Sequence, residues 1–366
     1  MIGSHDRIVL AHGGGGELMG RLIREHLLPA LSNPVLAPLT DSAVLPWPAG
    51  GEGITRQSAA AELVFTTDSY VVTPLEFPGG DIGRLAVAGT VNDLAVMGAE
   101  PVALSLALIL EGGLPLEVLD RLVASIAATA REAGVQIVTG DTKVIERRAR
   151  PGIDTQDAAP GGSTNDAPGL FITTAGVGRL RPGVRLGIER VEPGDRVLVN
   201  GTIADHGLAV MSVRSGLEFE SALRSDAAPL NGLIAAILDS GADVKFLRDA
   251  TRGGIAGVLA DISEGRSVTV EIDEACVPMS RTARHAAEML GLDPLTVANE
   301  GKCVIVVAEA DAERCLAACR AHALGRDAAV IGRVTDAAPP LVELITRAGG
   351  RRIVQRPYGE DLPRIC

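Results

Sequence analysis

Two kinds of hydrophobic pattern alternate along the first half of the chain. Short runs rich in apolar and β-branched residues, typical of buried strands, occupy 61–75, 101–110 and 135–141. Between them, 81–99 and 116–134 repeat apolar residues every three or four positions, as helices with one buried face do. The interleaving of the two patterns predicts a mixed α/β fold.

The second half continues in the same way. Pro193, Gly194 and Asp195 predict a turn between two strands within 183–203. Further elements are expected as helices at 228–241 and 252–265, strands at 267–273 and 301–309, and a strand or hairpin at 334–354. We therefore expect one domain over 1–177, a second over 178–345, and a mobile tail over 346–366.

One segment, 147–169, has almost no apolar residue and follows the strand predicted at 135–141. Its composition predicts a disordered surface loop. A plain insertion is the simpler interpretation, and a lid over a neighbouring site is the alternative.

Charge and composition narrow the class of protein. The net charge of −12 disfavours nucleic acid and anionic membranes as partners, and an aromatic content of 2% leaves few platforms for base stacking. Residues 1–10 lack the apolar core of a signal peptide, and the longest apolar run, 101–110, is too short to cross a bilayer. These features predict a cytoplasmic protein.

The five cysteines are consistent with a reducing compartment, because their number is odd and no C-x-x-C motif occurs. Cys276 and Cys303 lie in strand-like runs and are expected to be inert core thiols. Cys315, Cys319 and His322 share one face of a predicted helix. They have the spacing of metal ligands, but burial in the core is the preferred interpretation.

A run of four glycines, Gly13 to Gly16, precedes a helix-like segment. Such a backbone can cradle phosphate at a helix amino end. The spacing fits neither G-x-G-x-x-G nor a Walker A motif, so a simple hinge is an equal alternative.

Six aspartates stand where apolar runs meet Thr, Ser or Gly, namely Asp41, Asp68, Asp81, Asp93, Asp141 and Asp249. Each alone is typical of a cap or turn. Asp93 is unusual because it interrupts an apolar helix, where a carboxylate must face solvent or be paired. Together, and with Lys143 close to Asp141, they suggest a site for Mg²⁺ and a nucleotide.

The chain ends in Cys366, after a segment with two prolines and a glycine that excludes helix and central strand. A frayed end, a disulfide partner and a carrier thiol on a flexible arm are the three interpretations of this cysteine. Prenylation is excluded because no residue follows it.

Several long motifs resemble a known family in order and over essentially the whole chain. They are "TTDSYVVTPLEFPGGDIGRLAVAGTVNDLAVMGAEP", "GDTKV", "DHG", "DATRGG", "NEGK" and the terminal "PRIC". The chain resembles the hydrogenase expression/formation proteins of the HypE family. These belong to a larger group of ATP-using enzymes that includes aminoimidazole ribonucleotide synthetase. The terminal cysteine is the feature that distinguishes the HypE family within that group.

The resemblance implies a fold and a reaction. The fold is two α/β domains like those of aminoimidazole ribonucleotide synthetase, with the amino-terminal domains of a homodimer pairing into a β-barrel. In the reaction, the carbamoyltransferase HypF loads a carbamoyl group on Cys366, and ATP then drives dehydration of the thiocarboxamide to a thiocyanate. The cyano group passes to the HypC–HypD iron scaffold for a nickel–iron hydrogenase, so Cys366 becomes a carrier thiol.

The resemblance also implies roles for individual residues. The catalytic set is Cys366, Glu300 as base and Lys143 as phosphate ligand or proton relay, with His206 as a further candidate base. ATP is expected at Asp68, Thr90, Asn92, Asp93, Asp141, Lys143, Gly80 and Asp81. Mg²⁺ is expected at Asp41, Asp68, Asp93, Asp141 and Asp249.

Some features depart from the family, and other functions stay open. Ala204 and Ala250 replace the Gly and Pro that the family usually has, which puts only the local turns in doubt. A related kinase such as selenophosphate synthetase is the alternative enzyme, although its usual cysteine in the glycine-rich segment is absent here. A scaffold with a vestigial nucleotide site is the non-enzymatic alternative.

Overall fold

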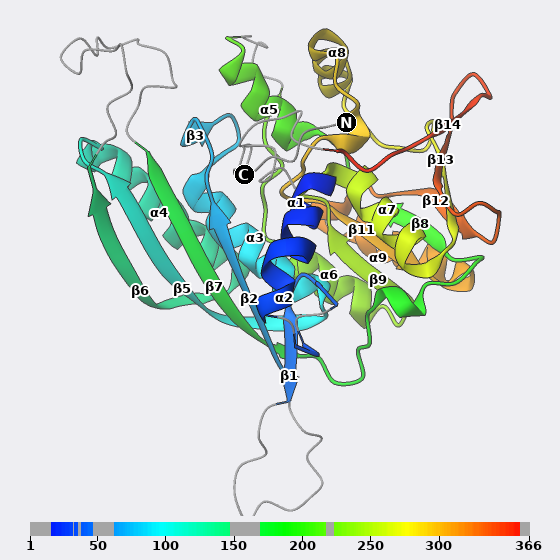
Figure 1. Ribbon diagram of the computed structural model, residues 1–366, viewed down its shortest axis with the longest axis horizontal. Helices are drawn as coiled ribbons and strands as arrows, with labels where there is room; N and C mark the ends of the chain where they lie inside the picture. The colour runs from blue at the N-terminus through cyan, green and yellow to red at the C-terminus, as the bar shows by residue number, and fades with distance from the viewer. Residues whose placement is uncertain are drawn as a thin grey trace, which may run out of the picture.

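The computed structural model describes residues 16–31, 33–35, 38–46, 62–146, 169–216 and 223–358. Two sheets with their helices lie side by side (Figure 1). The first sheet has the strand order β1-β2-β7-β5-β6. Its strands are β1 (Ala43–Pro46), β2 (Glu62–Tyr70), β5 (Ala99–Glu111), β6 (Gln136–Ile145) and β7 (Leu170–Leu180). Only β5 and β6 pair in parallel, because α4 (Leu116–Ala133) connects them across the sheet.

Helices α3 (Ile82–Val96) and α4 pack on one face of this sheet. A two-stranded ribbon, β3 (Glu76–Phe77) with β4 (Gly80–Asp81), leads into α3. Asp81 caps α3 by accepting a hydrogen bond from the Arg84 N–H at 2.9 Å. Gly134 ends α4 in the left-handed conformation (φ 71°). Both helices predicted for this half are therefore confirmed.

The second sheet has seven strands in the order β14-β13-β10-β12-β8-β11-β9. They are β8 (Arg196–Val199), β9 (Val244–Asp249), β10 (Thr269–Asp273), β11 (Cys303–Val307), β12 (Ala329–Thr335), β13 (Val342–Ile345) and β14 (Arg351–Ile353). The central strand β11 is buried on both faces. Val304 and Val306 pack into one core and Ile305 and Val307 into another, as alternate side chains of a strand do.

Helices cover both faces of this sheet. Those of the first core are α5 (Asp205–Arg214), α7 (Gly254–Arg266) and α8 (Arg281–Leu290). Those of the second core are α6 (Asn231–Asp239) and α9 (Ala312–Ala321), which Ala95 and Val96 of α3 join from the first domain. The helices expected at 228–241 and 252–265 and the strands expected at 267–273 and 301–309 are thus present, as is the β13–β14 hairpin within 334–354.

Shorter helical segments complete the described fold. They are α1 (Glu17–Leu22), η2 (Ile23–Leu27), α2 (Leu28–Leu31), η4 (Ile188–Arg190), η5 (Pro294–Thr296), η6 (Glu309–Asp311) and η7 (Ala323–Gly325). The prediction of two strands within 183–203 is half wrong. Only β8 is a strand, and the residues before the Pro193 turn form η4, where Arg190 bonds the Arg185 carbonyl and Val244 at 2.5 and 2.8 Å.

One boundary and one thiol differ from expectation. The tail predicted from residue 346 begins as part of the sheet, because Arg351–Ile353 pair with β13. Cys276 is exposed, so its prediction as a core thiol is wrong: it lies in the turn after β10, where Asp273 ends the strand. Cys303, Cys315 and Cys319 are buried in the second core, as predicted. The predicted loop 147–169 lies, except for Gly169, outside the described residues.

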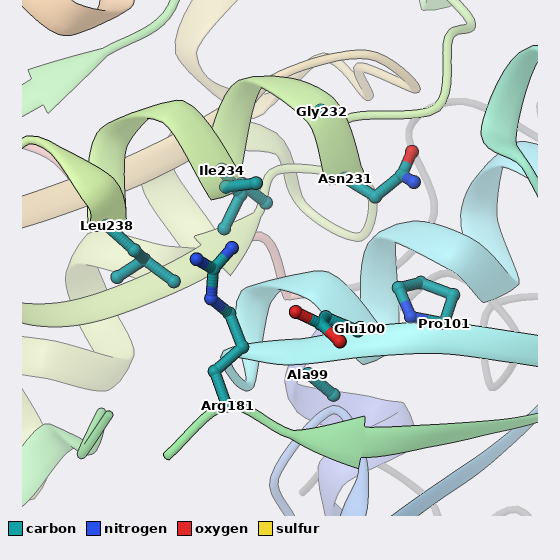
Figure 2. A pocket seen from close by; sticks show the side chains of 9 residues that line it. Ala99, Glu100, Pro101, Arg181, Asn231, Gly232, Ile234 and Leu238 are labelled. Carbon is teal, nitrogen blue, oxygen red and sulfur yellow. The ribbon is translucent and has the colours of Figure 1, made fainter. Parts of the chain in front are cut away.

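The seam between the two domains is held by α3. The Asn92 amide donates to the carbonyls of Ala228 and Glu300 at 3.1 and 3.3 Å, and its oxygen accepts from the Leu230 N–H at 2.7 Å. A pocket of about 210 Å³ opens at the same seam, between the start of β5 and α6. Figure 2 shows the Arg181 guanidinium reaching toward Ile234, with Glu100 beside it. Among the described residues, no helix is long and apolar enough to span a bilayer.

Candidate active site

Four aspartates from separate elements converge where the two domains meet. We name Asp41, Asp68, Asp93 and Asp249 the acidic cluster: they come from the loop before β1, from β2, from α3 and from the end of β9. Burial, together with the negative charges of Asp41 and Asp68, raises the pKa of Asp249 to about 7. Burial and the charges of Asp249, Asp41 and Asp68 likewise raise the pKa of Asp93 well above its usual value. Such mutual repulsion is typical of a site that binds a cation.

Hydrogen bonds from two hydroxyl groups hold Asp41 and Asp93 of the acidic cluster in place. Thr66 Oγ1 on β2 lies 2.9 Å from Asp93 Oδ2 and 3.0 Å from the Asp41 carbonyl oxygen. The Ser42 hydroxyl donates to the Asp93 carbonyl at 2.9 Å. Asp93 is therefore paired, which resolves how an apolar helix carries a carboxylate at this position.

Two arginines beside the cluster offset part of its charge. Arg248 on β9 binds Asp41 Oδ2 through Nε at 3.0 Å, and Arg252 binds Asp68 Oδ1 at 3.1 Å. Arg248 is only 16% exposed, whereas Arg252 is 51% exposed. Arg252 is thus placed at the mouth of the site, where an incoming phosphate group would meet it.

The donor set fits a hard divalent cation that is completed by substrate. Clustered carboxylates with few other ligands are what Mg²⁺ uses when nucleotide phosphates supply the remaining oxygens. Among the described residues, no group of three or more His, Cys, Asp or Glu side chains is already arranged to hold a metal by itself.

Asp141 and Lys143 lie apart from the acidic cluster within one chain. Both are on the edge strand β6 and are 62% and 67% exposed. The Lys143 ammonium lies 2.7 Å from both Asp141 oxygens, and this bond lowers the pKa of Asp141. The pairing of Ala107 with Asp141 puts them on the sheet face opposite α3 and α4.

Four other predicted nucleotide ligands are engaged with the protein. Asp81 caps α3, and Asn92 joins the domains as described above. Thr90 is fully buried, 2.5 Å from the Thr174 hydroxyl, and Gly80 packs closely under the Phe77 ring. These contacts help to position α3, and the role of the four residues as nucleotide ligands stays a prediction.

Glu300 lies in a buried polar pocket next to the cluster. It is 2% exposed, and its N–H donates to Asp226 Oδ1 at 3.1 Å. Asp226 also accepts from Lys302 Nζ at 3.0 Å. Burial would raise the pKa of Asp226, but the charges of Lys302 and His206 and the Glu300 N–H bring it below its usual value. The ion pair thus fixes the backbone on which Glu300 stands.

The buried side chain of Tyr70 lies near both Glu300 and the acidic cluster. Burial raises its pKa well above the usual value, and the charges of Asp68, Asp93 and Glu300 raise it further. Its hydroxyl lies 3.4 Å from Thr90 Oγ1. The charges of Asp68, Asp93 and Glu300 all act on the Tyr70 hydroxyl. Glu300 therefore lies close enough to the acidic cluster for their charges to interact.

His206, the other candidate base, is fully buried in α5. Its Nδ1 lies 2.8 Å from the Ser225 hydroxyl, and its ring meets Phe77 edge-to-face at 5.4 Å. Ala204, just before α5, adopts the left-handed conformation at φ 69°, which explains why the family usually has Gly there.

The chain that leads to Cys366 is anchored close to the acidic cluster. We name Arg356, Pro357 and Tyr358 the tail root. Its carbonyls at Pro357 and Tyr358 accept hydrogen bonds from the first N–H groups of α1, Glu17 and Leu18, at 3.0 and 3.1 Å. Cys366 itself lies outside the described residues, as do Gly13, Gly14 and Gly15. Gly16 caps α1, so a helix does follow the glycines.

Sequence reasoning did not identify the cations and the buried acid around these sites. Lys302 belongs to the "NEGK" motif, yet only Glu300 was singled out there. Arg248 and Arg252 flank Asp249 in "LRDATRGG", and their charge beside an expected acidic site was a usable signal. Asp226 carries no local signal, because its partners are more than seventy residues away.

Replacing Asp226 by alanine should cost about 3–5 kcal/mol of the free energy of unfolding, because it leaves Lys302 charged and only 11% exposed. Urea denaturation checks this. Glu100→Ala is the matched control: it removes an exposed partner of Arg179 and should change stability by about 1 kcal/mol or less. Equal losses in both variants would contradict the buried-pair account.

Comparison with known proteins first defines a class. Residues 40–180 match the N-terminal domain of AIR synthase related proteins, and residues 192–341 match their C-terminal domain. Together the two stretches contain the strands of both sheets up to β12 and all four aspartates of the acidic cluster, with Asp249 in the second stretch. The fold is therefore the two-domain AIR synthase fold that the sequence predicted.

Closer relatives then give the family. Carbamoyl dehydratase HypE of Rhizobium leguminosarum bv. viciae is 45% identical, over 99% of this chain and 96% of that protein. A solved HypE–HypF complex superposes with a TM-score of 0.78 at 42% identity, covering 92% of this chain and 99% of that one. A HypE structure in complex with ATP gives a TM-score of 0.75 at 39% identity, covering 98% and 100%. The chain belongs to the HypE family of hydrogenase expression/formation proteins.

Proposed function

We propose that this chain is an ATP-dependent carbamoyl dehydratase that supplies cyanide for nickel–iron hydrogenase maturation. The observation that carries the proposal is the position of the tail root beside the acidic cluster. The eight residues that follow Tyr358 can span at most about 27 Å when extended, which is enough for a terminal thiol to visit a neighbouring site. Relatives named carbamoyl dehydratase HypE support the assignment.

The proposed reaction removes one water from a thiocarboxamide. Its oxygen attacks the γ-phosphorus of ATP, ADP leaves, and the carbon–oxygen bond then breaks as phosphate departs. The two protons on nitrogen are lost, so that a carbon–nitrogen triple bond remains on the Cys366 sulfur. Phosphorylation is needed because an unactivated amide oxygen is a poor leaving group.

The residues divide this work among themselves. The acidic cluster would hold Mg²⁺, which neutralises phosphate charge when bound. Arg252 is placed to meet phosphate at the mouth, and Glu300 is the proposed base for the nitrogen protons. Burial keeps Glu300 away from bulk water, and the Asp226–Lys302 pair fixes its backbone.

We infer two kinds of partner. A relative has been solved in complex with HypF, which supports HypF as the source of the carbamoyl group. The HypC–HypD iron scaffold is the proposed acceptor of the cyano group. The net charge of −12 supports protein partners rather than nucleic acid.

We propose that the chain forms a homodimer through the face of the first sheet that lies opposite α3 and α4. Helices α3 and α4 cover one face, while Phe65, Ile109 and Ile145 on the other are 39–41% exposed. A second copy that packs its own sheet there would bury this apolar surface and form a barrel. Asp141 and Lys143 lie on the same face, so we propose that they act at this interface, toward the partner chain's nucleotide.

An Ile109→Arg variant should therefore be monomeric, because it buries an unpaired charge at the proposed interface. Light scattering after size exclusion measures the mass. Val123→Arg is the matched control, since Val123 is 42% exposed but lies on α4, on the covered side. If the dimer persists in Ile109→Arg but dissociates in Val123→Arg, the interface lies on the side of α4 and not on the proposed sheet face.

A phosphate-release assay tests the proposed function. The chain is first loaded with carbamoyl groups by HypF and carbamoyl phosphate, and is then separated from both and from the phosphate that loading releases. On addition of Mg–ATP the loaded chain should release one phosphate per carbamoyl group, and the unloaded chain should release little. A vestigial site would release phosphate in neither case. A small-molecule kinase such as selenophosphate synthetase would respond to its soluble substrate and not to loading.

A further inference from the structure

Each of the three residues of the tail root is bonded to a helix, although the tail root itself forms no helix or strand. Arg356 is paired with Asp261 and, at 3.2 Å, with Glu264, both on α7. The backbone carbonyls of the next two residues accept hydrogen bonds from α1. Arg356 is 22% exposed, so these ion pairs are screened less than those of the open surface.

The acid that holds Arg356 is shared with the acidic cluster. Asp261 accepts from Arg248 Nη1 at 2.7 Å, and the same guanidinium binds Asp41 through Nε at 3.0 Å. Arg248 is 16% exposed, Asp41 19% and Asp261 31%. Charges of alternating sign thus run without a break from a proposed metal ligand to the start of the carrier tail.

We propose that Asp41, Arg248, Asp261 and Arg356 form a relay through which occupancy of the nucleotide site sets how firmly the tail root is held. The proposal rests on the proposed function only in taking the acidic cluster as the Mg–ATP site. Arg356 is then a positioning residue: it fixes the point from which the chain leads on to Cys366 and does not touch the reacting atoms.

Electrostatics gives the direction of the coupling. A cation at the cluster draws the Asp41 carboxylate toward itself and repels Arg248. Arg248 then shifts its attraction to Asp261, which leaves less negative charge for Arg356. Binding of Mg–ATP therefore loosens the tail root, and by reciprocity a loosened root changes the affinity for Mg–ATP by the same factor.

Hydrogen exchange of the Glu17 and Leu18 amides measures how firmly the tail root is bound to α1, because these N–H groups donate to the tail-root carbonyls. The wild type is compared with Asp261→Asn, each with and without Mg–ATP. Asp293→Asn is the matched control: Asp293 is 32% exposed and pairs with Arg352 at 2.8 Å, whereas the ion pairs described for Arg356 are with Asp261 and Glu264. Arg356→Gln serves as a second variant in case Asp261→Asn unfolds α7.

In the wild type, Mg–ATP should speed exchange of the two amides about threefold or more. Asp261→Asn and Arg356→Gln should exchange that fast without nucleotide and respond no further, whereas Asp293→Asn should behave as the wild type. The relay is overturned if Asp261→Asn keeps wild-type exchange, or if calorimetry finds Mg–ATP bound with no change in exchange. If calorimetry finds no binding of Mg–ATP, both the proposed nucleotide site and its coupling to the tail root are wrong. The comparison of the wild type with Asp261→Asn without nucleotide then still shows whether Asp261 anchors the tail root.

Discussion

A Cys366→Ala variant should form no thiocyanate, while it still binds Mg–ATP with wild-type affinity. The thiol sulfur is the atom that carries the carbamoyl group, so its removal eliminates the substrate rather than slowing a step. The substitution leaves every residue of the acidic cluster, Glu300 and the tail root in place. Mass spectrometry of the loaded protein and calorimetry with Mg–ATP measure the two properties separately.

Cys276→Ala is the control for this variant. Cys276 is the exposed thiol among the described cysteines, and burial and Asp273 raise its pKa, which makes it a poor nucleophile. Its replacement should leave loading and dehydration unchanged. Thiocyanate on a chain that lacks Cys366, or loss of it on replacing Cys276, would identify a different carrier.

A Glu300→Gln variant should accept the carbamoyl group but dehydrate it about 100-fold more slowly or worse, as expected when a general base is removed. Glutamine keeps the size of the side chain and its buried position, and the backbone bonds to Asp226 and Asn92 do not depend on the carboxylate. The thiocarboxamide should therefore accumulate on the tail while Mg–ATP affinity is retained. Single-turnover analysis of the tail peptide measures the rate.

Glu309→Gln is the matched control, because Glu309 is 62% exposed and pairs only with Arg196 among the contacts described for it. It should dehydrate at the wild-type rate. Wild-type dehydration by Glu300→Gln would exclude Glu300 as the base, and His206 would be the next candidate. Loss of loading as well as dehydration would indicate damage to the fold instead.

The sequence predicted most of the regular structure, and four of the six aspartates that it singled out lie together in the acidic cluster. The apolar periodicity of α4 was strong because this helix buries one face, whereas α3 was recognisable as a helix that is apolar and buried almost all round. The strands of both sheets carried alternating or continuous apolar runs. Asp41, Asp68, Asp93 and Asp249 were recognised because carboxylates are rare beside buried strands. Their convergence follows from the pairing of the domains, which a single sequence does not display.

Other parts depended on contacts distant in the sequence. Residues 188–190 look like a strand but form η4, because Arg190 is drawn to Asp243 and the Val244 carbonyl across the fold. Asp226 has an ordinary local sequence and gains its importance only from Lys302 and Glu300. Cys276 lies beyond the end of β10 by three residues, and a boundary shift of that size reversed its burial.

The division of the predicted nucleotide ligands has a similar origin. Asp93 and Asn92 are neighbours on α3, yet one lies in the acidic cluster and the other binds the second domain, since adjacent helical positions point in directions about 100° apart. Asp141 and Asp68 both follow apolar runs but lie on opposite faces of the first sheet. Motif position alone did not distinguish these cases.

The most direct test of the central claim is the mass of the carboxyl-terminal peptide after incubation with HypF and carbamoyl phosphate. Without Mg–ATP, we predict that Cys366 gains one carbamoyl group and keeps it. With Mg–ATP, the same peptide should lose one water and become a thiocyanate. A peptide that stays unmodified while ATP is turned over, or a carbamoyl group that loses water without ATP, would contradict the account.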